Sequence, residues 1–298
     1  MKVLKDDTKI VDKEFMDRQI DLIKRKNDGI PTGFIDLDYQ WGGLKPGDTY
    51  LIGARPAMGK TAFILNMILN MAIKDGQKVA LFSLESSKEQ LVNRMWTIDS
   101  VVEGHHLRTG KLEEDEWNKI IESAERIANS NLVINDTCGL DIDDLDNELS
   151  TEAMSDVKVV FIDYLQLLNT EHVGDNRKLE TYYICERIKQ IAMKHNVAIV
   201  VLSQLSKVID TREDHRPVLS DFAYKDTPNY FDNVSFIYRD EYYNYETEDK
   251  GIAEIITARN KRGSRGVVIL AWIPEYQRFC NLEKLDCWDD EEGEETHE

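Results

Sequence analysis

The chain has 298 residues, of which 42% are hydrophobic and 31% are charged, and its formal net charge is −19. This length suits one large globular domain or a core domain with appendages. The excess of negative charge excludes a general nucleic-acid coat, so any nucleic acid must be bound in a localised basic groove.

The sequence shows no sign of a membrane or secreted protein. The longest apolar-rich run, residues 63–73, is too short to cross a bilayer, and the N-terminus lacks the apolar core of a secretion signal. The four cysteines lie far apart without a C-x-x-C pair, which fits a reducing compartment. The six histidines show no metal-ligand spacing, so we expect no protein-held zinc. We therefore expect a cytoplasmic protein that does not act at a membrane.

The two ends of the chain differ from its middle. Residues 8–26 place apolar side chains three to four apart, which predicts an amphipathic helix, and Gly and Pro then interrupt the pattern over 27–34. Such a helix either packs on its own domain or docks on a neighbouring subunit. Residues 284–298 hold eight acidic side chains and one lysine, which predicts a disordered tail or, as the alternative, a partner-binding or autoinhibitory one. We expect a helix and hinge over 1–28, a main domain over 29–283 and a tail over 284–298.

The main domain alternates apolar runs with helical periods. Strands are expected at 48–54, 78–85, 132–137, 157–163 and 198–204, and helices near 60–75, 87–102, 113–129, 141–154 and 178–195. This alternation predicts the α/β class, with a mostly parallel central sheet that helices cover on both faces. Later runs at 233–240, 253–260 and 266–274 have no helices between them, so we expect them to extend the sheet along one edge.

A possible phosphate-binding loop follows the first of these strands. It ends in Gly59-Lys60-Thr61, but the first glycine of the G-x-x-x-x-G-K-[ST] pattern is replaced by Ala54, and Gly53 lies one place too early. A turn over 53–59 followed by a helix would present N–H groups and the positive end of a helix dipole to an anion. Lys60 would reach the β- and γ-phosphates of ATP, and the Thr61 hydroxyl would bind Mg²⁺.

Polar residues also end other predicted strands, where open α/β sheets bind their ligands. Asp163 is expected at the metal, Glu85 is expected to deprotonate the attacking water, and Gln204 is expected to sense the γ-phosphate. Each has a structural alternative: a turn residue, an acid at a helix N-terminus and a hydrogen-bonding amide, respectively. Together with Lys60 they favour a site that cleaves ATP with Mg²⁺.

These residues lie in segments that resemble the motor domain of DnaB-type replicative helicases. The segments include ARPAMGKTAF (54–63), LFSLESSKEQLVNRM (81–95), FIDYLQLL (161–168) and VLSQLSK (201–207), and the likeness runs in order over about 29–282. That family commonly carries Ala or Gly ahead of RPxMGK, so the loop resembles a permitted variant. The resemblance implies that the following residues contact the nucleotide: Ala54, Arg55, Pro56, Ala57, Met58, Gly59, Lys60, Thr61 and Ala62.

The resemblance also implies a RecA-like P-loop NTPase fold and a ring of six subunits with ATP between neighbours. Single-stranded DNA would thread the ring, which would translocate 5′ to 3′ and unwind duplex in replication, with a helicase loader or primase as candidate partners. The helix at 8–26 resembles the family's linker helix, which docks on the adjacent subunit. We expect the 28 residues before GIPTGF to hold no counterpart of the family's N-terminal helical domain.

Two segments depart from the family's pattern. Residues 259–263 read RNKRG in place of KQRNG, so the cation that completes a neighbour's site is open among Arg259, Lys261 and Arg262. Lysine is a poor substitute there, because it lacks the planar fork of arginine.

Residues 223–226 read AYKD in place of the family's DNA-contacting Arg-Glu-Ser-Gly loop. Lys225 is a candidate for a phosphate contact and Tyr224 for stacking on a base. The other candidate DNA-facing cations, each with solvated surface charge as the alternative, are Arg177, Lys207, Arg212 and Arg216. Three functions follow: a ring helicase, a DnaB-like ATPase that remodels or loads onto nucleoprotein without unwinding, and a subunit that modulates another helicase ring.

Overall fold

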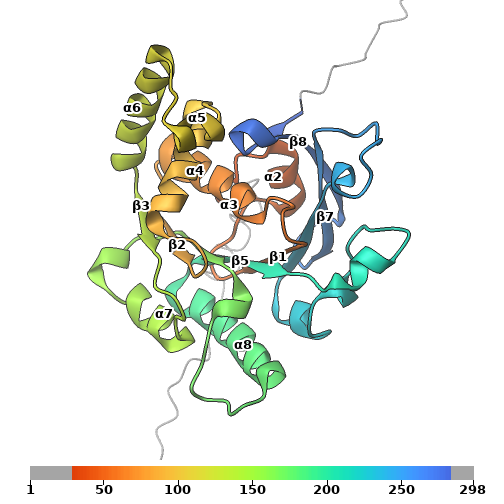
Figure 1. The fold of residues 1–298 in the computed structure, drawn as a ribbon. Helices are drawn as coiled ribbons and strands as arrows, with labels where there is room; N and C mark the ends of the chain where they lie inside the picture. The colour runs from red at the N-terminus through yellow and green to blue at the C-terminus, as the bar shows by residue number, and fades with distance from the viewer. Residues whose placement is uncertain (1–28, 283–298) are drawn as a thin grey trace, which may run out of the picture.

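A single sheet of nine strands organises the part of the chain that the computed structural model describes, residues 29–282. The predicted helix at 8–26 and the acidic tail lie outside these residues. The strands are β1 (Thr49–Ala54), β2 (Val79–Ser83), β3 (Leu132–Asn135), β4 (Val159–Asp163), β5 (Ala198–Gln204), β6 (Asn233–Tyr238), β7 (Ile252–Asn260), β8 (Gly266–Ile273) and β9 (Arg278–Asn281). Their order in the sheet is β3-β2-β4-β5-β1-β6-β7-β8-β9 (Figure 1).

The sheet is parallel from β3 to β6 and antiparallel from β6 to β9. Every residue of β1, β2, β4 and β6 is buried, because both faces of the parallel part are covered and the strands are largely apolar. This confirms the predicted α/β class with a mostly parallel sheet, and it confirms that the late runs extend the sheet along one edge. The short strand β9 was not predicted.

Helices form a layer on each face of the sheet (Figure 1). The helices are α2 (Ile35–Trp41), α3 (Lys60–Leu69), α4 (Lys88–Ser100), α5 (Gly104–Thr109), α6 (Glu114–Ala128), α7 (Ile142–Leu149) and α8 (Arg177–His195). One buried cluster joins the sheet to α2, α3 and α4, and a second joins it to α7 and α8. The five predicted helices are present, whereas the short α2 and α5 were not predicted.

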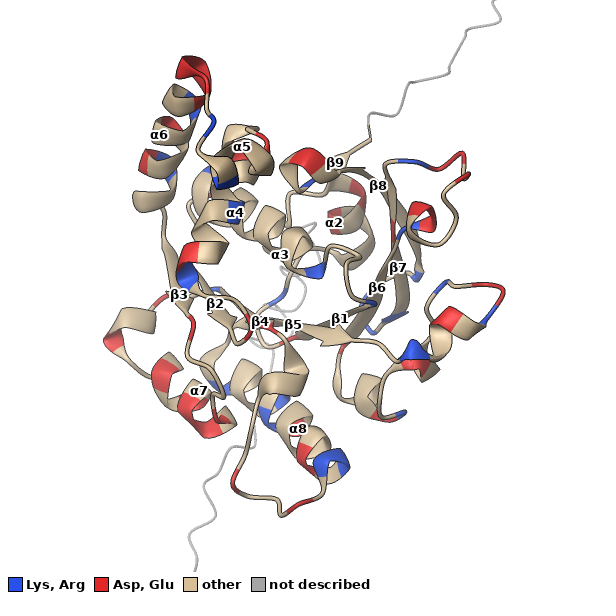
Figure 2. Ribbon diagram, in the orientation of Figure 1, with Lys and Arg blue, Asp and Glu red and all other residues tan. Residues whose placement is uncertain are grey.

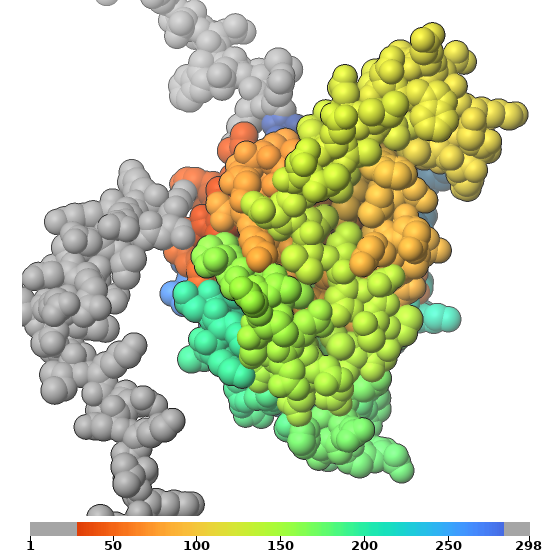
Figure 3. Space-filling view, turned by 90° about the vertical axis from the view of Figure 1, so that its left-hand side faces the viewer, coloured from red at the N-terminus to blue at the C-terminus, as the bar shows by residue number. Residues whose placement is uncertain are grey.

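The surface of the molecule carries two further features. Helices α5 and α6 project from the body of the molecule (Figures 1 and 3). Acidic residues are concentrated on α7 and on the first turn of α6 (Figure 2). Within the described residues, no helix is both long enough and apolar enough to cross a membrane.

The strand order creates two functional edges. The strands β1, β2, β4 and β5 run parallel within one half of the sheet, so their carboxyl ends and the start of α3 share one edge. Strand β7 runs the other way, and its last residue, Asn260, pairs with Asn233 at the start of β6. The turn at 261–265 therefore lies at the opposite edge of the sheet. We call these the carboxyl edge and the amino edge.

Candidate active site

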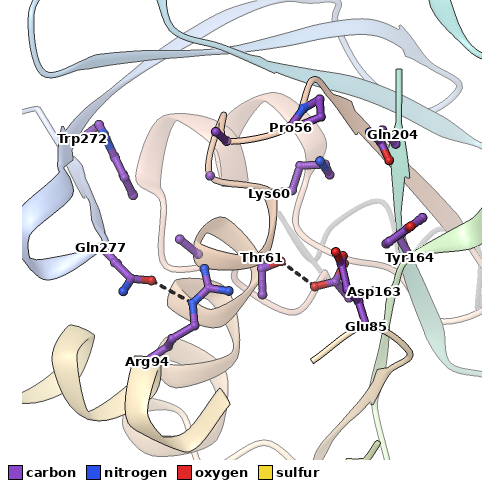
Figure 4. A pocket seen from close by; sticks show the side chains of 13 residues that line it. Pro56, Lys60, Thr61, Glu85, Arg94, Asp163, Tyr164, Gln204, Trp272 and Gln277 are labelled. Atoms are coloured by element: carbon purple, nitrogen blue, oxygen red, sulfur yellow. Dashed lines mark hydrogen bonds between the residues drawn. The ribbon is translucent and has the colours of Figure 1, made fainter. Parts of the chain in front are cut away.

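A cavity of about 420 Å³ opens at the carboxyl edge. It brings together Lys60, Thr61, Glu85, Asp163 and Gln204, the five residues predicted from the strand ends. Figure 4 shows Lys60 and Thr61 between two groups of side chains, with Glu85, Asp163 and Gln204 on one side and Arg94, Trp272 and Gln277 on the other. The remaining lining residues are Pro56, Ala57, Gly59, Ala62 and Tyr164.

The backbone of the loop explains why Ala54 is acceptable in place of glycine. Ala54 is the last residue of β1 and pairs with Gln204 as part of the sheet. The left-handed residues come later, at Ala57 (φ 62°) and Gly59 (φ 94°). Glycine is favoured where the backbone turns left-handed or where a side chain has no room. Gly53 meets the second condition, since a Cβ there would lie 2.8 Å from the Leu205 side chain.

Lys60 begins α3 and carries the cation at the centre of the cavity. Its ammonium donates to the carbonyl oxygen of Arg55 at 3.5 Å and forms no ion pair within residues 29–282. Burial lowers the pKa of Lys60, and the nearby carboxylates of Asp163 and Glu85 partly oppose this. A half-buried ammonium at a helix N-terminus, without its own counterion, is suited to bind phosphate.

Thr61 and Asp163 could supply oxygen atoms to a metal ion. The Thr61 hydroxyl donates to Asp163 Oδ2 at 2.6 Å, and the Asp163 side chain is buried at the end of β4. Burial raises the pKa of Asp163, because the ionised form lacks enough compensating charge. Hydroxyl and carboxylate oxygens are the ligands that Mg²⁺ prefers, so this pair fits that ion.

Glu85 and Gln204 lie on the same side of the cavity. The Glu85 carboxylate is exposed and makes no hydrogen bond or ion pair with another described residue, so it is free to accept a proton from water. Gln204 is held through its backbone by Gln166, whose side-chain amide donates to the Gln204 carbonyl oxygen at 3.1 Å and accepts from its N–H at 3.3 Å. The position of Gln204 is thus fixed while its side chain faces the cavity (Figure 4).

Three lining residues on the other side of the cavity were missed from the sequence. Arg94 of α4 donates through Nε to Gln277 Oε1 at 2.8 Å, and burial lowers the pKa of its guanidinium. Trp272 and Gln277 come from β8 and the turn before β9. No spacing rule identifies them, because their position depends on how α4 and the late strands pack beside the loop.

Not every residue of the run 54–62 turns its side chain to the cavity. Ala54 and Met58 are buried in the core. The Arg55 guanidinium points away and binds Asp210 at 2.6 Å, as well as the Leu205 carbonyl oxygen at 3.0 Å. Of the nine residues expected to contact the nucleotide, those that line the cavity are therefore Pro56, Ala57 and the run 59–62.

The three candidate trans-acting cations lie near the amino edge, away from this cavity. The Lys261 ammonium pairs with Asp232 at 2.9 Å, and the Arg262 guanidinium makes a two-point contact with Asp48. Arg259 instead donates to two neutral acceptors, the Pro228 carbonyl oxygen and Asn229 Oδ1, each at 3.1 Å.

The candidate DNA-facing residues divide by their partners. Arg177 pairs with Glu180 at 2.6 Å, Arg212 with Asp221 at 2.8 Å and Arg216 with Glu254 at 2.6 Å. Lys207 and Lys225 are exposed and form no ion pair within residues 29–282. The Tyr224 ring meets the edge of Tyr182 at 6.2 Å between centroids. The structure does not gather these six residues on one element.

Comparison with known proteins identifies the family. The family model described as the DnaB-like helicase C terminal domain matches residues 29–281. The chain is 40% identical over 268 residues to the replicative DNA helicase DnaC of Bacillus subtilis (strain 168), and 39% identical over 259 residues to the replicative DNA helicase DnaB of Geobacillus stearothermophilus. These matches cover 88% and 86% of this chain but 59% and 57% of the two relatives, so the chain spans less than two thirds of their length.

Solved structures agree in fold. A structure described as an ATPase domain superposes with a TM-score of 0.88 at 33% identity, covering 93% of this chain and 100% of that one. A DnaB-like replicative helicase, in a study of its interactions with primase, gives 0.86 at 33% identity, covering 92% of this chain and 69% of that one. The RadB recombinase shares the fold alone, with a TM-score of 0.54 at 17% identity over 85% of this chain and 100% of that one. These likenesses confirm the predicted RecA-like fold, and the chain belongs to the DnaB-like helicase C-terminal domain family.

Proposed function

We propose that the protein is the ATP-hydrolysing motor of a DnaB-type helicase, which uses ATP and Mg²⁺ to move along single-stranded DNA and unwind duplex in replication. The observation that carries this proposal is the convergence of Lys60, Thr61, Glu85, Asp163 and Gln204 on one cavity from four strand ends. Relatives at 35–40% identity named as replicative DNA helicases support it.

Each residue has a role that follows from its surroundings. Lys60 and the N–H groups at the start of α3 bind the β- and γ-phosphates, while Thr61 with Asp163 would hold Mg²⁺, which would neutralise charge on the phosphates. Glu85 accepts a proton from the water that attacks the γ-phosphorus, while the leaving ADP oxygen takes the bond electrons. Gln204 contacts the γ-phosphate and so distinguishes ATP from ADP.

A cation from a neighbouring subunit completes the site, and we assign that role to Arg259. Lys261 and Arg262 already neutralise Asp232 and Asp48, and withdrawing either cation would remove part of the compensation of a buried carboxylate. Arg259 would leave only neutral acceptors. It also keeps the planar fork that suits a phosphoryl oxygen.

The assembly that this role requires is a ring, with six subunits expected and single-stranded DNA in its centre. Lys207 and Lys225 are the strongest candidate phosphate contacts, since neither is engaged by a carboxylate within residues 29–282. A helicase loader or primase is a candidate partner, and one similar structure concerns a DnaB-like helicase and its interactions with primase. We place the protein in the cytoplasm.

ATP turnover with Mg²⁺ and oligothymidine tests the proposal. We expect DNA-stimulated turnover in the wild type, its loss in Lys60→Ala, and wild-type behaviour in Lys74→Ala, a control that removes an exposed lysine after the same helix. Absence of turnover in the wild type would reject the proposal. Turnover without strand separation on a forked substrate would instead favour an ATPase that remodels nucleoprotein.

A further inference from the structure

The side chain of Arg55 links the phosphate-binding loop to another segment. Arg55 is buried, with 8% of its surface exposed. Its guanidinium donates to both carboxylate oxygens of Asp210, at 2.6 and 3.2 Å, and to the Leu205 carbonyl oxygen at 3.0 Å. A two-point, charge-assisted contact of this kind has a fixed direction and is stronger than a neutral hydrogen bond. The backbone carbonyl oxygen of Arg55 meanwhile accepts from Lys60. Arg55 therefore contacts the cavity's lysine on one side and Asp210 on the other.

Asp210 has its own support. It lies in the 3₁₀ turn η4 (Lys207–Thr211), and its Oδ1 accepts from the Tyr243 hydroxyl at 2.9 Å. The Tyr243 ring stacks on His215 with centroids 4.0 Å apart. The hydrogen bond from Arg55 is the main cause that lowers the pKa of Asp210 below its ordinary value. The carboxylate of the Arg55–Asp210 ion pair is therefore also held by Tyr243, whose ring is in turn packed on His215.

The segment that Asp210 belongs to follows Gln204 directly. Residues 205–216 include Lys207, Arg212 and Arg216, three of the six candidate DNA-facing residues. The segment is held in shape by the bonds of Arg212 to Asp221 and of Arg216 to Glu254. Gln204 and Arg55 therefore both connect the cavity to this segment, Gln204 through the chain and Arg55 through Asp210 and Leu205, and such a contiguous network is a physical route by which two sites can be coupled.

We propose that Arg55 and Asp210 are positioning residues that couple occupancy of the nucleotide cavity to strand binding by residues 205–216. The identity of the two ligands rests on the proposed function. Coupling is reciprocal, so the DNA strand must change nucleotide affinity by the same factor by which nucleotide changes affinity for the strand. If the ion pair were purely structural, its removal would change the stability of the protein and leave this coupling factor unchanged.

The test measures the dissociation constant of ADP with Mg²⁺, with and without oligothymidine, which needs no hydrolysis. In the wild type we expect DNA to change ADP affinity by at least about fivefold, the lower end of typical coupling, and in Asp210→Asn by less than about twofold. The matched control is Glu213→Gln, which removes the same charge from an exposed side chain in the same segment. Asp210→Glu keeps the carboxylate and is expected to recover most of the factor.

Tyr243→Phe is the second variant, since it removes one hydrogen bond to Asp210 and keeps the stacked ring. If DNA changes the ADP affinity of Tyr243→Phe by a factor between those of the wild type and Asp210→Asn, the proposal is supported. A wild-type factor in folded Asp210→Asn, or a factor of one in the wild type itself, overturns the coupling and leaves the ATPase assignment standing. Failure of the wild type to bind ADP overturns both.

Discussion

The two edges of the sheet treat similar side chains in opposite ways. At the carboxyl edge, Lys60 has no ion-pair partner within residues 29–282, Arg94 bonds to a neutral amide, and burial shifts the pKa of Asp163 upward. At the amino edge, burial also acts to raise the pKa of Asp232, but hydrogen bonds from Lys189 and Lys261 bring it down to about 2. Ionisable side chains thus lack compensating partners of opposite charge at the carboxyl edge and have them at the amino edge.

This difference distinguishes charged side chains that are available to bind a ligand from charged side chains that stabilise the fold. A buried ionisable group without an internal partner costs stability, so such groups mark binding and catalytic sites. A buried group with two cationic partners is stabilised by the protein itself and is costly to disturb. This criterion supports the proposal that the chemistry takes place at the carboxyl edge. By the same criterion, Arg259 is the one of the three candidate cations whose withdrawal would not deprive a carboxylate of its partner.

The largest expected effect concerns Arg259. Arg259→Ala is expected to lower ATP turnover by about a thousandfold or more, the scale of a lost arginine finger, because Lys261 and Arg262 are paired with carboxylates of their own subunit. Turnover is measured with Mg²⁺ and DNA. Mixing Arg259→Ala subunits with Lys60→Ala subunits should restore part of the rate, since some interfaces then join an intact cavity to an intact Arg259. If Arg259→Ala turned over ATP at the wild-type rate, the assignment of Arg259 as the trans-acting cation would be contradicted.

The next effect concerns the metal. Asp163→Asn is expected to raise the Mg²⁺ concentration for half-maximal turnover by about 10- to 100-fold, because an amide oxygen carries no charge to attract the ion. A Mg²⁺ titration of ATP turnover measures this. Asp75→Asn, an exposed aspartate beyond the far end of α3, is the control. An unchanged Mg²⁺ requirement would mean that Asp163 does not serve the metal.

A moderate effect on stability is expected at the amino edge. The folded-state pKa of Asp232 is lowered from 3.8 to about 2, so its contribution to stability is present above pH 3.8 and lost as the pH falls toward 2. Asp232→Asn is expected to lower the free energy of unfolding by about 2 kcal/mol at pH 7 and by much less near pH 2. Urea unfolding at both pH values measures the difference. The exposed Asp249→Asn should match the wild type throughout; equal losses at both pH values in Asp232→Asn would contradict the assigned cause.

The smallest effect concerns strand binding. Lys207→Ala is expected to weaken binding of oligothymidine a few-fold and to reduce the slope of log affinity against log salt by about one, the signature of one lost phosphate contact. Lys158→Ala removes the same charge from an exposed position just before β4 and should leave the slope unchanged. Equal slopes in Lys207→Ala and the wild type would exclude a phosphate contact at this residue.

Much of the fold could be predicted because buried parallel strands require continuous apolar runs. The runs at 157–163 and 198–204 became β4 and β5 nearly residue for residue. Strand β9 escaped prediction because it has only four residues, of which Phe279 alone is buried in the core. Helix α2 has only seven residues, which is too short to show a clear helical period in the sequence, and it begins without a side-chain cap that would mark its start.

The candidate site divides in the same way. Lys60, Glu85, Asp163 and Gln204 could be predicted because strand ends in a parallel sheet converge, which follows from local pattern alone. The positions of Arg94 and Gln277 could not, since these residues meet only after packing and lie 183 residues apart. The pairing of Arg216 with Glu254, 38 residues away, was hidden for the same reason.

The left-handed turn at Ala57 is held from outside the loop. An alanine in this conformation costs about 1 kcal/mol relative to a relaxed backbone. The Arg239 guanidinium donates to the Ala57 carbonyl oxygen at 3.2 Å and lies 5.0 Å from the centre of the Trp272 ring. Arg239 itself is absent from the cavity wall. The conformation of the loop at Ala57 is thus supported by a side chain outside the cavity, so a substitution at Arg239 alters the surroundings of the loop while every residue of the cavity wall stays in place.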